Sequence, residues 1–279
     1  FLAGGKHIEF ALKIEPSLKE DLVWAKYVKP MTANLPTSIR DICYYGFTEI
    51  FNNAIDHSGG SETYSEISID EKEIAIVIMD NGIGIFRKIR EALQLETTKE
   101  AILHLSKGKF TTAPSNHTGE GIFFTSRAFD SFSIYSEDMF YTFTGRDWFL
   151  SSERQEDFGK GTYIKMIIKL NSTTVLKELF DEFANQEIGF AKTIVAVALS
   201  ADPNDPHISR SQAKRLLLGL EKFRSVVLDF TGVQSVGQAF VDEVFRVFKN
   251  EHPNVNINYI NANADVESMI KRGQAAAEF

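Results

Sequence analysis

The stretch Thr48–Ser58, TEIFNNAIDHS, ends a long helical pattern and decides how the chain is interpreted. From about residue 37 apolar side chains recur at helical spacing, and Gly59-Gly60 stops the pattern. Within the stretch Glu49 and Asn53 lie four residues apart, so both side chains leave one face of the helix. A carboxylate can polarise water and an amide oxygen can bind Mg²⁺. Because such pairs are usually only solvated, further motifs have to support a site.

A second motif follows the strand-like run Ile74 to Met79. The run leads into Asp80, and Gly82, Gly84 and Ile85 follow within a glycine-rich turn. Glycine lets a backbone approach a ligand closely, and a carboxylate at this place can accept a hydrogen bond from the exocyclic amine of adenine. An ordinary Asp-Asn-Gly turn is the alternative interpretation.

Two further glycine motifs lie downstream. The first comprises Thr118, Gly119, Gly121 and Ile122 and opens a predicted helix, where backbone N–H groups and the helix dipole favour phosphate. In the second, Gly159-Lys160-Gly161-Thr162, a hydroxyl at the start of a strand can bond to a base or to water. The segment Ser106–Thr118 is polar, rich in Gly, Ser and Thr, and too long for a tight connection, which is typical of a mobile lid.

The order and spacing of these motifs resemble the GHKL superfamily of histidine-kinase-like ATPases, whose members carry E-x-x-x-N, D-x-G-x-G, G-x-G and G-x-G-T boxes. The resemblance covers roughly residues 1 to 170 and implies a Bergerat-type α/β sandwich that binds ATP and Mg²⁺. By resemblance, Glu49 is the candidate general base, Asn53 the Mg²⁺ ligand, Asp80 the adenine anchor and Gly119–Ile122 the phosphate cradle. The candidate nucleotide contacts are therefore Asn53, Asp80, Gly82, Gly84, Ile85, Thr118, Gly119, Gly121, Ile122 and Thr162.

The stretch GEGIFFTSRAFD, residues 119–130, is similar to a segment of bacterial anti-sigma-factor serine kinases. Asp56 and His117 depart from the superfamily pattern at places where a lysine and a glycine are often found. These departures imply either weaker phosphate binding or compensation by lid residues such as Lys107 or Lys109. No upstream phosphoacceptor-histidine helix is recognisable, so autophosphorylation on histidine is not expected.

Composition shifts near residue 171, which predicts an ATP-binding domain over 1–171 and a smaller α/β domain over 172–279. The second domain contains SRSQAKRLL and VVLDFTGVQSVGQAFVDEVFRVF and resembles a STAS-like domain. STAS antagonists carry a phosphorylated serine before a helix, but the matching stretch Val236–Phe240 has no hydroxyl. We interpret Ser235 as a turn residue or helix cap and Asp229 as either functional or a turn initiator. The charged face of Asp242, Glu243 and Arg246 either docks a partner or is simply solvated.

Composition narrows the class of protein. The chain has 279 residues, 43% of them hydrophobic, and a net charge of −8, so bulk attraction to nucleic acid or anionic lipid is not expected. No apolar stretch approaches the ~20 residues of a membrane span, and no secretory signal is present, which predicts a cytoplasmic protein. Cys43 is expected to be a buried structural thiol. Because the sequence begins at Phe1, we expect a fragment or a processed chain.

Three functions are consistent with these motifs. The preferred hypothesis is an intracellular ATP-dependent switch with slow ATP hydrolysis, in which nucleotide orders the lid and the STAS-like domain transmits that state to a protein partner. The alternatives are a serine/threonine protein kinase of the anti-sigma-factor type and a non-catalytic nucleotide sensor. Association of two copies of the chain is also left open.

Overall fold

The computed structural model describes residues 5–109, 119–145, 147–152, 160–185, 189–201 and 207–276. These residues form two compact units. Unit 1 comprises the described residues of Phe1–Gln94 and Thr111–Phe180, and unit 2 those of Leu95–Phe110 and Asp181–Phe279. An internal segment thus belongs to the same unit as the C-terminal third of the chain, whereas the sequence-based prediction placed a single boundary near residue 171.

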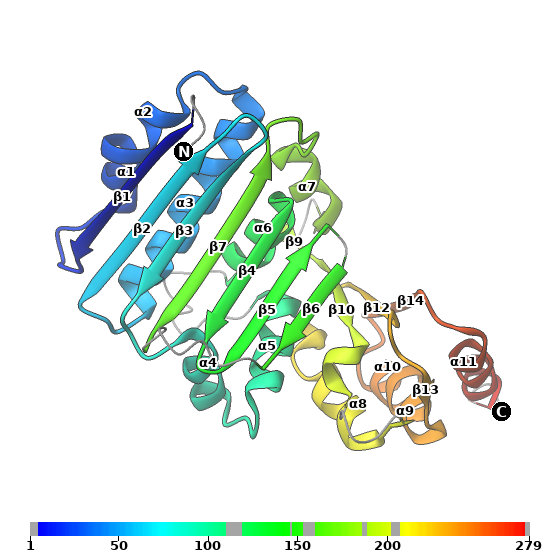
Figure 1. Cartoon of the computed structure of the whole chain (residues 1–279). Helices are drawn as coiled ribbons and strands as arrows, with labels where there is room; N and C mark the ends of the chain where they lie inside the picture. The colour runs from blue at the N-terminus through cyan, green and yellow to red at the C-terminus, as the bar shows by residue number, and fades with distance from the viewer. Residues whose placement is uncertain are drawn as a thin grey trace. The chain divides into compact units, whose positions relative to one another are not determined.

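Unit 1 is built on one antiparallel seven-stranded sheet of order β1-β2-β3-β7-β4-β5-β6, seen face on in Figure 1. Its strands are β1 (Lys6–Lys13), β2 (Glu62–Ile69), β3 (Glu73–Asp80), β4 (Ser131–Ser136), β5 (Met139–Thr144), β6 (Asp147–Ser151) and β7 (Thr162–Lys169). Alternation of apolar and polar residues predicts all of them except β6, because strand residues point alternately to the two faces.

Helices α3 and α6 lie on one face of this sheet, behind it in Figure 1. The helices of the unit are α1 (Glu20–Val23), the π-helix η1 (Trp24–Val28), α2 (Lys29–Thr32), α3 (Thr37–His57), α4 (Ile85–Leu93) and α6 (Gly121–Ala128), and α7 (Leu176–Phe183) follows the last strand. Phe47 and Phe51 of α3 are fully buried and stack with ring centroids 5.2 Å apart. Burying such a side chain stabilises the fold by roughly 1.5–3 kcal/mol.

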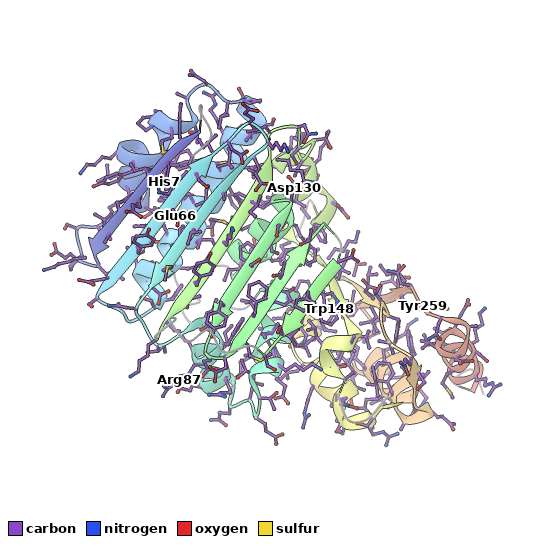
Figure 2. The ribbon with its side chains drawn as sticks, in the orientation of Figure 1. His7, Glu66, Arg87, Asp130, Trp148 and Tyr259 are labelled. Carbon is purple, nitrogen blue, oxygen red and sulfur yellow. The ribbon has the colours of Figure 1, made fainter. Side chains whose placement is uncertain are left out.

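The two faces of the sheet differ in what they carry. On the helix-covered face Phe10 of β1 stacks on Tyr27 of η1, with ring centroids 4.2 Å apart. The opposite face is open in Figure 2, where His7 and Glu66 are labelled, and their side chains approach to 3.8 Å. Residues of even and odd number on β2 therefore lie on different faces, with Glu66 on the open one.

Unit 2 has a parallel three-stranded sheet of order β10-β12-β14. Its strands are β10 (Lys192–Ala196), β12 (Ser225–Asp229) and β14 (Asn256–Ile260), with the short pairs β8 (Ala184–Asn185) with β9 (Gly189–Phe190) and β11 (His207–Ile208) with β13 (Ser235–Val236). Its helices are α5 (Thr98–Lys107), η2 (Val197–Ser200), α8 (Arg210–Leu217), η3 (Leu220–Lys222), α9 (Gln238–Asp242), the π-helix η4 (Glu243–Val247), α10 (Phe248–Glu251) and α11 (Ala264–Ala276). The predicted α/β fold class is confirmed.

Helix α5 is the element of unit 2 that the sequence-based interpretation missed. It packs on β10 and η2, and Ala101 and Ile102 are fully buried. Its start carries a recognisable signal, because the Thr97 side chain accepts a hydrogen bond from the Glu100 backbone N–H. Ser17 and Glu20 have the spacing of a capping box, which predicts a helix start at Ser17, but this prediction is wrong, since α1 begins at Glu20 without a side-chain cap.

No helix in the described ranges is long and apolar enough to cross a membrane.

Candidate functional site

One end of the helix-covered face in unit 1 carries polar side chains in a single cross-strand row. Asp80 of β3 pairs with Thr63 of β2 and with Thr162 of β7, and Thr162 pairs in turn with Ser136 of β4. Residues paired in this way project to the same face of a sheet. We call these four residues the polar row.

The remaining positions on this face are nearly all apolar. The buried side chains that continue it from strand to strand are Ile67, Ile69, Ile74, Ile76, Ile78, Phe132, Ile134, Ile164, Met166 and Ile168. A face that is apolar along its length and polar at one end is suited to a ligand that has a polar edge, because an apolar pocket with a few placed polar groups is typical of ligand sites.

Asp80 is held by several donors. The backbone N–H of Gly82 donates to Asp80 Oδ1 at 2.9 Å, and the Thr162 hydroxyl, which accepts from the backbone N–H of Ile85 at 3.0 Å, also bonds to the Asp80 carboxylate. Burial raises the pKa of the Asp80 carboxyl above its usual range, while these hydrogen bonds and the positive charge of Lys88 act in the opposite direction. The carboxylate therefore has a fixed orientation in a poorly solvated place.

Glycines let the backbone close around the polar row. A Cβ at Gly161 would lie 1.8 Å from the carbonyl oxygen of Asp80, and one at Gly82 would lie 2.2 Å from that of Ser58. Gly161 also has φ +116° and Gly84 has φ +89°, which other residues rarely adopt. Two of the predicted glycine motifs and the end of α3 thus meet around Asp80.

A second contact joins the middle of α3 to the start of α6. A Cβ at Gly121 would lie 2.0 Å from Glu49 Oε2, so any larger residue would displace the end of this side chain. The pKa of the nearby Tyr45 hydroxyl is raised by burial and then by the negative charges of Glu49 and Glu120. The N-terminal end of α6 is therefore an acidic environment.

The other predicted residues lie beside this contact. Asn53 is half-buried on α3, one turn after Glu49, and Ile122 is half-buried in the first turn of α6. Gly119 precedes α6 with φ +73°. Thr118 lies outside the described residues, so its predicted role is untested.

The structure corrects one expectation about the lid. Lys107 ends α5 and is 2% exposed, and its ammonium group donates to the backbone carbonyls of Arg215 and Leu218 at 3.2 and 3.0 Å. Lys109 donates to another backbone carbonyl of unit 2 at 3.1 Å. Lys107 is therefore a structural anchor and not a phosphate contact, while residues 110–118 of the predicted lid lie outside the described ranges.

Two members of the polar row, Thr63 and Ser136, were not identified from the sequence. The Thr63 hydroxyl donates to the carbonyl of Met79, and the Ser136 hydroxyl donates to that of Gly161, each at 2.9 Å. The available signal was a polar residue at an inward position of an otherwise alternating strand. That signal is weak without the register, because only the strand pairing shows that such residues are neighbours.

Polar residues singled out in unit 2 have structural roles. Asp229 Oδ1 accepts from the backbone N–H and the hydroxyl of Thr231 at 2.9 and 2.7 Å and from Asn261 Nδ2 at 2.9 Å. These bonds make Asp229 a turn initiator. Ser235 lies in β13, and Gly237 is the N-cap of α9, so Ser235 does not cap that helix.

The charged face predicted on α9 and η4 is paired within unit 2. Arg210 of α8 approaches Asp242 to 3.0 Å and Glu243 to 3.4 Å, and Arg246 bonds to Asp242 at 2.8 Å. Only 11% of the Glu243 side chain is exposed. These charges hold α8 against the α9–η4 segment, which favours the solvated, structural interpretation of this face.

The described residues give little support for a protein-held metal site or for a reactive thiol. In the part of the chain that the structure describes, no group of three or more His, Cys, Asp or Glu side chains is arranged to hold a metal ion. Cys43 is fully buried, and burial raises its pKa to about 12, so the thiol stays protonated. A buried structural thiol was predicted.

Part of unit 2 matches a known protein family. Residues 212–267 match the family described as a STAS-like domain of unknown function (DUF4325). The chain therefore has a C-terminal STAS-like domain, in agreement with the resemblance seen in its sequence. No curated protein matches the chain.

Proposed function

We propose that unit 1 binds ATP together with Mg²⁺ and that the chain is a slow ATPase switch acting on a protein partner through its STAS-like domain. The observation that carries the proposal is the polar row at one end of an otherwise apolar, helix-covered face. The GHKL resemblance supports the same assignment, since Asp80 and Thr162 of two separate motifs lie side by side in this row.

The polar row is the proposed base end of the site. An ionised carboxylate offers about four acceptor sites, and Asp80 accepts from Gly82 and Thr162, so it has capacity for an exocyclic amine. Adenine presents such an amine, whereas guanine presents an oxygen at the equivalent place. The carboxylate would therefore favour ATP over GTP.

The contact of Glu49 with Gly121 marks the proposed phosphate end. Glu49 lies nine residues before Ser58, the C-cap of α3, which corresponds to ~14 Å along a helix axis. Backbone N–H groups at the start of α6 can bind phosphate, but the charges of Glu49 and Glu120 oppose an anion there. A bound cation would remove this conflict.

The residues present fit Mg²⁺ carried in by the nucleotide. Mg²⁺ commonly uses one or two protein oxygens together with substrate phosphates and water, and so needs no complete protein cage. Asn53 would supply its side-chain oxygen, and Glu49, one turn earlier on α3, would position the attacking water. Bound Mg²⁺ would neutralise charge on the phosphates.

Calorimetry and thermal unfolding of the full chain test the proposal. Saturating ATP with Mg²⁺ should stabilise the protein by about 2.7 kcal/mol at 100 times the Kd, and GTP should do much less. Asp80→Asn should lose the effect, and Asn53→Ala should lose its Mg²⁺-dependent part. Equal stabilisation by ATP and GTP, or an unchanged Asp80→Asn variant, would refute the assignment.

Product analysis then separates hydrolysis from transfer. An ATPase releases labelled free phosphate, whereas a serine/threonine kinase moves the label to a protein. Binding without either product would leave a nucleotide sensor as the function.

A further inference from the structure

Ser65 of β2 is buried next to the polar row. It pairs with Ile78 of β3, two residues along the ladder from the Thr63–Asp80 pair, and lies on the same helix-covered face. Its neighbour Glu66 points to the open face, as Figure 2 shows. The Ser65 side chain is 0% exposed.

Within the residues that the structure describes, the hydroxyl of Ser65 has no hydrogen-bond partner. Three other buried hydroxyls of the sheet have partners: Thr63 bonds to Met79 and Ser136 to Gly161, and Ser133 lies 3.0 Å from the hydroxyl of Thr142. The buried hydroxyl of Thr125 on α6 resembles that of Ser65 in having no partner among the described residues, but it does not belong to the sheet. An unpaired buried hydroxyl is costly, and an aliphatic side chain would fit the surrounding apolar face better. A serine here therefore calls for a partner that binds from outside the chain.

The position of Ser65 relative to Asp80 suggests that partner. The two residues are diagonal neighbours on adjacent strands, and their side chains project to one face. The Cα atoms of such diagonal neighbours are roughly 7–8 Å apart. Two polar side chains in this relation can bond to the same ligand group or to one bridging water molecule. Ser65 can act as donor or acceptor, so it can complement either.

We propose that Ser65 is a further purine-binding residue, whose hydroxyl hydrogen-bonds to the base held by Asp80, directly or through one water. This rests on the proposed ATP binding. When the base is bound, the Ser65 hydroxyl gains the partner that the protein itself does not provide. Ser65 thus contributes to affinity, while Asp80 distinguishes adenine from guanine.

Titration of the full chain with ATP and Mg²⁺ tests the proposal, using Ser65→Ala and the control Ser68→Ala. Ser68 lies on the same strand but on the opposite face, so the control makes the same chemical change away from the site. Ser65→Ala should raise the Kd about 2- to 12-fold, the effect of losing one hydrogen bond between neutral groups. Its melting temperature without nucleotide should stay the same or rise, because an unpaired hydroxyl is removed.

Each result has a distinct meaning. If the wild-type chain binds no ATP, the proposed function itself fails. If the wild type binds ATP and Ser65→Ala binds equally well, only the role of Ser65 is refuted. A lower melting temperature of Ser65→Ala without nucleotide, with unchanged Kd, would show that the hydroxyl has a structural partner. Loss of affinity in Ser68→Ala as well would also overturn the specific role of Ser65.

Discussion

The polar groups of the two units are arranged in different ways. In unit 1 they gather at one end of an apolar face, where Asp80 is poorly solvated and the Ser65 hydroxyl has no partner among the described residues. In unit 2 they bond to one another or to helix ends, as Arg210 does with Glu243 and as Lys107 does with the Leu218 carbonyl. Polar groups of the first kind suit a ligand, whereas those of the second kind specify the fold. Substitutions of these polar side chains in unit 1 should therefore change binding and turnover, and substitutions of the paired polar side chains in unit 2 should change stability.

The largest effect is expected where the backbone closes around the polar row. Gly161→Ala should destabilise the protein by about 4 kcal/mol or more, because the new Cβ overlaps the Asp80 carbonyl and the residue has φ +116°. Gly219→Ala in unit 2 is the control, since its φ is also positive at +85° but nothing lies within 4 Å. The control should lose only about 1–2 kcal/mol. Chemical denaturation followed by circular dichroism measures both, and equal losses would contradict the close approach.

Turnover should depend on Glu49. Glu49→Gln is expected to lose about 10²–10⁴ in the rate of phosphate release at saturating ATP and Mg²⁺, because a general base is removed. Affinity for ATP should be largely kept. Asp41→Asn, at an exposed position of the same helix, is the matched control and should behave as wild type. An unchanged rate in Glu49→Gln would remove this residue from the mechanism.

The buried lysine of unit 2 should make stability depend on pH. Burial lowers the pKa of Lys107 from 10.5 to about 7, although the charge of Glu221 opposes the shift. Between these values the unfolded chain holds a proton that the folded chain has lost, so stability should rise with pH. The slope is expected to reach up to about 1.4 kcal/mol per pH unit.

Denaturation at several pH values, compared with Lys107→Met, measures this contribution. The variant should lack it, and Lys249→Met, at an exposed position of α10, should retain it. A wild type that shows no such rise would mean that the carbonyls of Arg215 and Leu218 keep the ammonium group charged.

The smallest effect is expected for the ion pair between α8 and η4, in which the Arg210 side chain is 52% exposed. A double-mutant cycle with Arg210→Ala and Glu243→Gln should give a coupling of roughly 0.2–1 kcal/mol, which falls as salt is added. The Kd for ATP should not change in either variant. Weakened ATP binding would mean that this pair is not purely structural.

Sequence patterns predicted most elements of the fold. The apolar period of α3 and the alternation in β2, β3 and β7 depend only on local spacing, so they could be recognised without a structure. Strand β6 and helix α5 were missed. Capping signals were also misjudged, since Ser17 does not cap α1 whereas Ser209 forms a capping box with Gln212. Such signals are short, and neighbouring structure decides which of them is used.

The sequence by itself determined the residue types that carry the proposed chemistry and their order along the chain. Glu49, Asp80 and Gly121 could be named from motif and spacing alone. Only the tertiary structure decided which residues are neighbours, since the pairing of β2 with β3 places Ser65 beside Asp80. It also decided that Lys107 anchors α8, because contacts between distant segments depend on packing and register, which local spacing does not encode.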